Sequence, residues 1–281
     1  MKKRIALVCM GGLFHGAYVV GAVKALLEVY KLEDIDLIYA TSASAGTLAY
    51  YVSKQFSQGI KIWQDHVPKK EFFHLRLRKL LNLDYIIDYV MKKVIPLDVK
   101  SIKKSKTEFF ISATQKNGKK ALISANNRKV LEIIKASMSI PILSHSVRMN
   151  KKDYVDGTFC YPLPFNRRIK QADIVIVILT KDPTNKKIEK KEQSEHRFLS
   201  FFLPKVLKKE FQEETKCFDR ELKNLEKLEK NRKVIFVYHK KKLPYSMLDN
   251  SKKAINHLIN LGFDDAKNNK ELKETFLNKK L

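Results

Sequence analysis

Serines at the end of an apolar segment are the first candidates for chemistry in this chain. The strand-like apolar run that begins at Leu37 stops at Ser44, and small residues then lead into a helical pattern. A nucleophile elbow needs this order of strand, sharp turn and helix, with small residues around a serine whose Oγ is exposed. A helix beginning at Ala45 would also direct its unpaired N–H groups and positive dipole end toward the serine. The pattern therefore predicts that Ser44 is at the apex of the turn and suits acyl transfer.

The same residues have a simpler interpretation. Serine is a preferred N-cap, so a turn rich in Ser, Ala and Thr could do no more than begin a helix. The usual G-x-S-x-G pattern also stands here as Ser42-x-Ser44-x-Gly46, without its first glycine. Other parts of the chain must decide between the two interpretations.

A glycine-rich loop precedes this turn. The short apolar strand Ile5–Met10 leads into Gly11-Gly-Leu-Phe-His-Gly16, and helical spacing follows over Ala17–Leu27. Backbone N–H groups in such a loop can face an anion, and the helix dipole strengthens the effect. The loop lacks the G-x-G-x-x-G spacing of a dinucleotide site and the Gly-Lys-Ser/Thr of a P-loop. With a serine turn after the next strand, an oxyanion hole fits better than a phosphate site.

Asp156 is the candidate carboxylate. It lies in Asp153–Thr158, before the apolar strand Ile174–Leu179, where a strand end would present it in a tight turn. Asp-Gly is also one of the commonest turn dipeptides, so Asp156 alone does not define a site.

Composition indicates one globular α/β domain, or such a domain with helical additions. The chain has 281 residues, of which 44% are apolar and 10% aromatic, enough to bury a large core. Its three cysteines lie far apart, which argues against structural disulfides and a cysteine zinc site and favours a reducing cytosol. A hairpin through Asn117-Gly118 is a strong local prediction. The other predicted elements are helices over 48–66, 69–95, 130–137 and 198–230, the last containing Pro204, and a strand over 234–238.

The net charge of +26 is carried mostly by dispersed lysines. Solvated helix faces and biased composition explain it simply, whereas attraction to an anionic membrane or to nucleic acid is the functional interpretation. No helix-turn-helix, zinc-finger or RNP pattern supports nucleic acid. No run of about 18 apolar residues predicts a transmembrane helix, and the N-terminus does not continue as a signal peptide. A cytoplasmic protein is expected, with Lys69–Lys79, basic and aromatic, as the candidate for peripheral membrane contact.

Taken in order, these pieces resemble the patatin-like phospholipase family from about residue 5 to residue 180. The resemblance rests on the Gly-Gly loop, the serine turn, Ala136-Ser-Met-Ser-Ile-Pro141 and Tyr154-Val-Asp-Gly157 before an apolar strand. The tail is similar to a bacterial branch of the family through Val234–Tyr238 and Leu261–Ala266.

The resemblance implies a three-layer α/β/α fold with a mostly parallel central sheet and C-terminal helical additions. It places a catalytic core in residues 1–190 and a helical extension with one further strand in 191–281. The implied activity is that of a lipid acyl hydrolase, phospholipase A or lysophospholipase-like, which cleaves carboxylic esters through an acyl-enzyme without a cofactor or metal. The implied site has Ser44 as nucleophile, Asp156 as base, the backbone of Gly11, Gly12 and Leu13 as oxyanion hole, and Ser42, Gly46, Gly16 and Gly157 as elbow and loop support.

Four residues depart from the family pattern. Ser42 replaces the first glycine of the elbow, Leu13 the third loop glycine, His15 an arginine or lysine, and Thr158 a glycine or alanine. Leu13 can still donate its backbone N–H if its φ is negative. A catalytically weak or inactive family member that binds anionic membranes is the alternative function.

An α/β-hydrolase with a Ser-Asp-His triad is the nearest enzymatic competitor. That fold places several strands before its elbow and a histidine last, whereas only one clear strand precedes Ser44 here. The available histidines are His196, His239 and His257, and their sequence contexts are those of structural or solvated residues.

Overall fold

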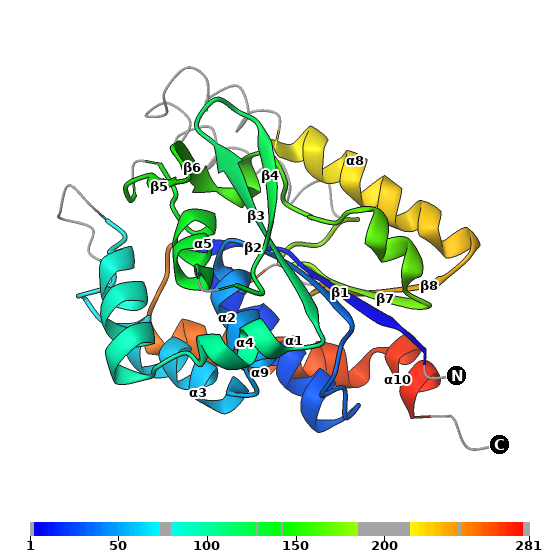
Figure 1. The fold of residues 1–281 in the computed structure, drawn as a ribbon. Helices are drawn as coiled ribbons and strands as arrows, with labels where there is room; N and C mark the ends of the chain where they lie inside the picture. Colours follow the sequence, from blue (N-terminus) through cyan, green and yellow to red (C-terminus); the bar gives the residue numbers. More distant parts are fainter. Residues whose placement is uncertain are drawn as a thin grey trace.

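The computed structural model describes residues 3–73, 80–127, 129–141, 143–184, 214–240 and 243–277. They form one mixed sheet flanked by helices, in the strand order β5-β6-β3-β2-β1-β7-β8, with β4 paired to β3 (Figure 1). The strands are β1 (Ile5–Cys9), β2 (Leu37–Thr41), β3 (Glu108–Gln115), β4 (Lys120–Ser124), β5 (Val147–Met149), β6 (Lys152–Asp156), β7 (Ile174–Ile178) and β8 (Lys233–Val237).

The centre of the sheet is parallel and one end is antiparallel. β3, β2, β1, β7 and β8 run in parallel, whereas β4, β5 and β6 join by antiparallel pairing. The predicted hairpin is confirmed, because β3 and β4 pair through the turn at Asn117-Gly118, where Gly118 has a φ of 84°. The carboxyl ends of β1 and β2 lie side by side, which brings the glycine loop next to the serine turn.

Helices cover both faces of the sheet. On one face the core includes α1 (Gly16–Glu28), α2 (Ala43–Val52), α5 (Val130–Ser137) and α9 (Lys252–Asn268), and on the other it includes α8 (Glu214–Glu226). The remaining helices and single turns are η1 (Leu13–His15), α3 (Phe56–Lys61), η2 (Ile62–His66), η3 (Asp84–Val94), α4 (Val99–Lys104), η4 (Gly157–Phe159), η5 (Arg167–Gln171), η6 (Lys227–Lys230) and α10 (Lys270–Phe276).

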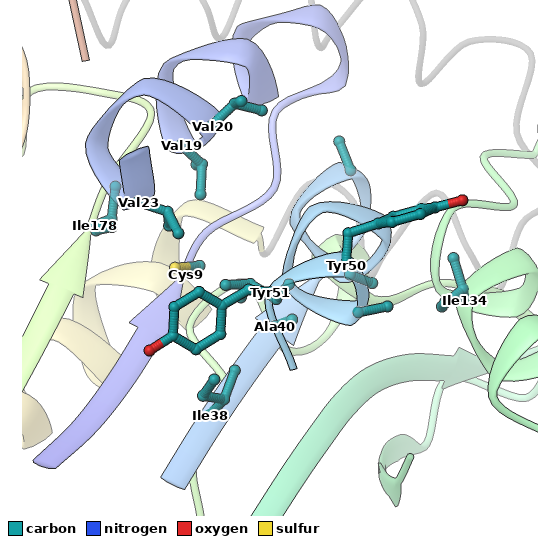
Figure 2. Close-up of a cluster of buried hydrophobic side chains, with 14 of the residues drawn as sticks. Cys9, Val19, Val20, Val23, Ile38, Ala40, Tyr50, Tyr51, Ile134 and Ile178 are labelled. Carbon is teal, nitrogen blue, oxygen red and sulfur yellow. The ribbon is translucent and has the colours of Figure 1, made fainter. Parts of the chain in front are cut away.

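Side chains of the central strands alternate between these two cores. Leu7 and Cys9 of β1 pack with α1 and α2, whereas Val8 between them packs on the face of α8. This alternation follows from the two-residue period of a strand, and a strand buried on both faces is apolar throughout. Figure 2 shows Val23 of α1 and Tyr51 of α2 among the side chains that fill the first core. The sheet, buried on both faces, is therefore a rigid base for the loops at its carboxyl edge.

The C-terminal part is built into this base. β8 extends the sheet beside β7, and α9 packs so closely on α1 that a Cβ on Gly21 would lie 1.8 Å from the carbonyl oxygen of Ile259. Glycine is needed there because no side chain fits between the two backbones. This contact fixes α1 and the loop that leads into it. The division of the chain at residue 190 stays a prediction.

One predicted helix is shorter than expected, and another lies partly outside the described residues. Only residues 84–94 of the region 69–95 form the helix η3; residues 69–72 form turns, and 74–79 lie outside the described residues. Of the long pattern over 198–230, residues up to 213 also lie outside them, and α8 begins at Glu214. Among the helices of the described residues, none has the length and apolar character needed to cross a bilayer.

Candidate active site

The turn between β2 and α2 has Ser42, not Ser44, at its apex. β2 ends at Thr41 and α2 begins at Ala43, so Ser42 alone joins them, with φ 54° and ψ −128°. This conformation is nearly restricted to glycine and costs a serine on the order of 1–3 kcal/mol. The expectation that the helix begins at Ala45 with Ser44 at the apex is therefore wrong.

Ser44 is fully buried in the first turn of α2. Its hydroxyl donates to the carbonyl oxygen of Thr41 at 2.8 Å, lies 3.1 Å from that of Cys9, and accepts the Thr41 amide at 3.0 Å. The side chain thus connects the ends of β1 and β2 and has no access to a substrate. The elbow pattern is accordingly Ala40-x-Ser42-x-Ser44, and the alignment of Ser42 with the first glycine is also wrong.

Ser42 contacts the predicted carboxylate directly. Its Oγ donates to Asp156 Oδ2 at 2.6 Å, a short bond of the charge-assisted kind. The Ser42 amide donates to the Oγ of Ser137 at 2.8 Å, and the Asp156 amide donates to the carbonyl of Ser139 at 2.8 Å. The segment at the end of α5 therefore fixes the main chain of both partners. Ser137 belongs to the Ala-Ser-x-Ser-Ile-Pro motif, but its hydrogen bond to the elbow could not be read from the sequence.

Burial makes Asp156 a stronger base than an exposed aspartate. Its side chain is 1% exposed, and this desolvation raises the pKa of the carboxyl from 3.8 to about 6. Hydrogen bonds from Ser42 and Thr158 stabilise the carboxylate and oppose the increase. A carboxyl with a pKa near 6 is ionised at neutral pH and is a better proton acceptor than one near 4.

The glycine loop passes directly over Ser42. A Cβ on Gly11 would lie 2.6 Å from the Cβ of Ser42, so only glycine allows this approach. Gly12 has a φ of 149° and Leu13 a φ of 48°, so the condition of a negative φ at Leu13 is not met. No described residue accepts a hydrogen bond from the amide of Gly12 or Leu13. These two amides remain available to an anion beside Ser42.

His15 is a neutral residue behind this loop. It is buried, its Nε2 lies 3.1 Å from the carbonyl oxygen of Tyr245, and burial lowers the pKa of the imidazole to about 4. The ring therefore carries its proton on Nε2 and donates it to Tyr245 at neutral pH. Stabilisation of an oxyanion must then come from backbone amides and helix N-termini, without a cationic side chain at this position.

The three supporting glycines are placed around the turn. Gly16 begins α1, where a Cβ would lie 2.8 Å from that of Ala43. A Cβ on Gly157 would lie 2.2 Å from the Oγ of Ser112, whereas a Cβ on Gly46 of α2 would lie 4.0 Å from Cγ2 of Ile134, an ordinary van der Waals contact. Gly16 and Gly157 thus permit close packing behind the serine and the carboxylate, respectively.

The histidines of the competing triad have other contacts or lie outside the described residues. His239 is buried with its Nε2 3.1 Å from the carbonyl oxygen of Thr180, and the His257 ring packs edge-on against Tyr245. His196 lies outside the described residues. Since the single hydroxyl proton of Ser42 is donated to Asp156, a carboxylate occupies the place that histidine has in a triad.

An apolar pocket leads away from Ser42. It is lined by side chains of α2, η2, η3 and the segment after α5, among them Leu13, Tyr50, Trp63, Met91 and Ile140. The space open to the centres of water molecules is about 50 Å³, several times the roughly 10–15 Å³ that one water needs. The indole N–H of Trp63 is satisfied by the Thr47 hydroxyl at 3.0 Å, so this wall offers few free polar groups. Such a lining suits a hydrocarbon chain.

Comparison with known proteins identifies the family of this chain. The family model described as patatin-like phospholipase matches residues 7–168, more than half of the chain. The chain therefore belongs to the patatin-like phospholipase family, which implies lipid acyl hydrolase activity.

No curated protein matches the chain as a sequence. Among solved structures, VipD from Legionella pneumophila is similar with a TM-score of 0.47 and 12% identity, over 98% of this chain and 67% of that one.

Proposed function

We propose that this protein hydrolyses carboxylic esters of lipids through a Ser42–Asp156 dyad. The observation that supports the proposal best is the 2.6 Å hydrogen bond from the Oγ of Ser42, at a strained strand-to-helix apex, to a buried carboxylate. The nucleophile proposed here differs from the Ser44 expected from the sequence, whereas Asp156 is proposed in the role expected for it, as are Gly12 and Leu13 of the glycine loop.

In the first half-reaction, Ser42 Oγ attacks the ester carbonyl carbon while Asp156 Oδ2 accepts the hydroxyl proton. The carbonyl oxygen becomes an oxyanion that the amides of Gly12 and Leu13 and the N-terminus of α2 stabilise. When the tetrahedral intermediate collapses, the carbon–oxygen bond to the alcohol breaks, and the alcohol leaves with the proton from Asp156. An acyl chain in the apolar pocket remains esterified to Ser42.

The second half-reaction repeats these steps with water. Asp156 accepts a proton from water, hydroxide oxygen attacks the acyl carbon, and the oxyanion forms again beneath the loop. Collapse breaks the bond to Ser42 Oγ, which recovers its proton from Asp156, and the fatty acid leaves. Each step uses only groups that the site already brings together.

Covalent labelling tests the nucleophile. A fluorophosphonate probe should form an adduct with Ser42, because the probe phosphorus takes the place of the ester carbon. Trypsin cleavage after Lys31 and Lys54 leaves both candidate serines in one peptide, so fragment ions must locate the adduct. An adduct on Ser44, or none on an intact folded protein, would contradict the dyad.

We further propose that an anionic membrane surface supplies the substrate. In the described part of the chain, the large apolar side chains with high exposure are Tyr89 at 51%, Val94 at 42% and Leu277 at 47%. Tyr89 and Val94 lie on η3, whose buried residues Ile86 and Met91 line the apolar pocket. Lys93 is exposed on the same helix and, within a chain of net charge +26, complements anionic lipid, whereas Lys92 pairs with Asp88 at 2.5 Å.

Vesicle hydrolysis tests this surface. Rates on vesicles containing phosphatidylglycerol should exceed those on phosphatidylcholine alone and should fall as salt rises, since each lysine contributes about 1 kcal/mol and is screened over ~8 Å at physiological ionic strength. Combining Tyr89→Ser, Lys93→Gln and Val94→Ser should reduce the vesicle rate and leave a soluble short-chain ester unaffected. The matched control is Leu277→Ser, which removes an exposed apolar residue from outside η3.

Equal rates on both vesicle types at low salt would contradict the membrane proposal. Biased surface composition would then be the explanation of the net charge. The sequence predicts Lys69–Lys79 as the membrane contact. Lys69 and Lys70 of this stretch are exposed, and residues 74–79 lie outside the described residues. Replacing both lysines by glutamine in a separate variant measures their share of the anionic preference.

A further inference from the structure

Thr180 is hydrogen-bonded to the glycine loop. It lies two residues after β7, the strand that pairs with β1, and its side chain is buried. Its Oγ1 donates a hydrogen bond to the carbonyl oxygen of Gly11. The same Oγ1 would lie 2.8 Å from a Cβ on Gly12. The hydroxyl is therefore packed against the backbone of both glycines.

The direction of one loop amide follows from this hydrogen bond. In a trans peptide the C=O of one residue and the N–H of the next point in opposite directions, and the described peptide bonds are trans. Because the Gly11 carbonyl is held at Thr180, the Gly12 N–H points away from Thr180. This amide is one of the two to which the oxyanion is assigned above.

Thr180 is itself fixed at the carboxyl edge of the sheet. The amide of Leu179 donates to the carbonyl oxygen of Val237 in β8 at 2.9 Å. The carbonyl oxygen of Thr180 lies 3.1 Å from Nε2 of His239, which is buried and packs edge-on against the Tyr18 ring. The hydroxyl of Thr180 thus connects the loop to a rigid part of the fold.

The second loop amide is fixed in a different way. The amide of His15 donates to the carbonyl oxygen of Gly12 at 2.9 Å, within the loop itself. That bond sets the direction of the Leu13 N–H through backbone contacts alone. Loss of the Thr180 hydroxyl should therefore disturb one donor of the pair and leave the anchor of the other in place.

We infer that Thr180 is a positioning residue of the oxyanion hole: its hydroxyl orients the Gly11–Gly12 peptide so that the Gly12 N–H faces the developing oxyanion. This inference rests on the proposed function of the Ser42–Asp156 pair. A donor that is oriented in advance stabilises the transition state without reorganisation during the step. Glycine permits many backbone conformations, so the peptide can rotate when the hydroxyl is absent.

Hydrolysis of a soluble short-chain ester tests the inference. Thr180→Ala should lower kcat/KM by roughly 10- to 100-fold, less than the 10²–10³-fold that loss of a whole oxyanion-hole donor costs. Thr180→Ser keeps the hydroxyl and should retain most of kcat/KM. Both variants lose the same methyl group, so the difference between them measures the hydroxyl.

A transition-state analogue separates positioning from packing. When Ser42 Oγ adds to the carbonyl carbon of an alkyl trifluoromethyl ketone, Asp156 accepts the hydroxyl proton and the ketone oxygen becomes an oxyanion. Thr180→Ala should therefore weaken inhibition by the ketone by the same factor as kcat/KM. The corresponding secondary alcohol has no carbonyl group, and its inhibition should stay unchanged.

Thr275 provides the matched control. It is buried in α10, and its hydroxyl donates to the carbonyl oxygen of Glu271 at 2.6 Å. Thr275→Ala removes the same kind of hydrogen bond outside the site, so it should lower Tm without changing kcat/KM or inhibition by the ketone.

The outcomes distinguish the inference from the proposed function. Complete labelling of Ser42 by the fluorophosphonate probe counts the folded sites, so rates can be compared per folded site, and Thr180→Val is a second variant without the hydroxyl. Unchanged kcat/KM and ketone inhibition in Thr180→Ala and Thr180→Val, or an equal loss in Thr180→Ser, would overturn the inference. An unmodified protein that neither hydrolyses esters nor labels at Ser42 would instead overturn the proposed function itself.

Discussion

Ser42→Ala is expected to reduce turnover of a short-chain ester by roughly 10⁴-fold or more, to the level that binding and the oxyanion loop alone provide. The substitution removes the hydroxyl oxygen of the proposed nucleophile, on which the acyl-enzyme would form. Ser42→Gly should be equally inactive but at least as stable as the unmodified protein, because glycine adopts φ 54° and ψ −128° without strain. Loss of activity without loss of Tm in Ser42→Gly would assign the effect to chemistry.

The control for this experiment is the neighbouring serine. Ser44→Ala should retain activity within about tenfold and lose on the order of 1–3 kcal/mol of stability, since the buried Thr41 amide loses its hydrogen-bond acceptor. An inactive Ser44→Ala combined with an active Ser42→Ala would restore the assignment expected from the sequence.

The sequence was sufficient for the fold because its central strands are short, apolar and separated by clear turn residues. The runs at β1, β2 and β7 are buried on both faces, so each reads as a strand without alternation. The Asn-Gly turn likewise fixes the β3–β4 hairpin from local chemistry alone. What the sequence could not supply was the packing of η3 and the pocket beside it, which depends on side chains distant along the chain.

The strand-turn-helix elbow was predicted in outline, but its apex lies two residues earlier than expected, at Ser42. Ser42 and Ser44 are both flanked by small residues, and Gly46 favoured the frame that placed Ser44 in the middle. The local sequence does not define the end of β2 to within two residues. The parallel register of β2 with β1 and β3 does define it, and this register depends on the tertiary structure. The hydrogen bond between Ser42 and Asp156, 114 residues apart in the chain, is likewise visible only in the fold.

Asp156→Asn is expected to lower turnover by about 10²–10⁴-fold, the usual range for loss of a general base. Asparagine keeps the shape of the side chain and can still accept the Thr158 amide through Oδ1, but its amide nitrogen cannot take the proton of Ser42. His239→Ala and His257→Ala are the comparison variants, and neither should lose activity on this scale. A large loss in one of them together with a mild Asp156→Asn would favour a histidine triad.

The same substitution should stabilise the protein at neutral pH. Burial raises the pKa of Asp156 from 3.8 to about 6 in the folded state, so the native protein binds a proton more tightly than the unfolded chain. Stability from this group is therefore present below about pH 4 and is lost as pH rises through 6, a difference on the order of 3 kcal/mol. Because asparagine stays neutral, its advantage over aspartate should vanish near pH 4 and reach its maximum above pH 7. Urea unfolding of both proteins at pH 4 and pH 7.5 measures this difference in stability. If the Asp156→Asn protein is less stable at pH 7.5, the carboxylate charge stabilises the fold, which would contradict the prediction.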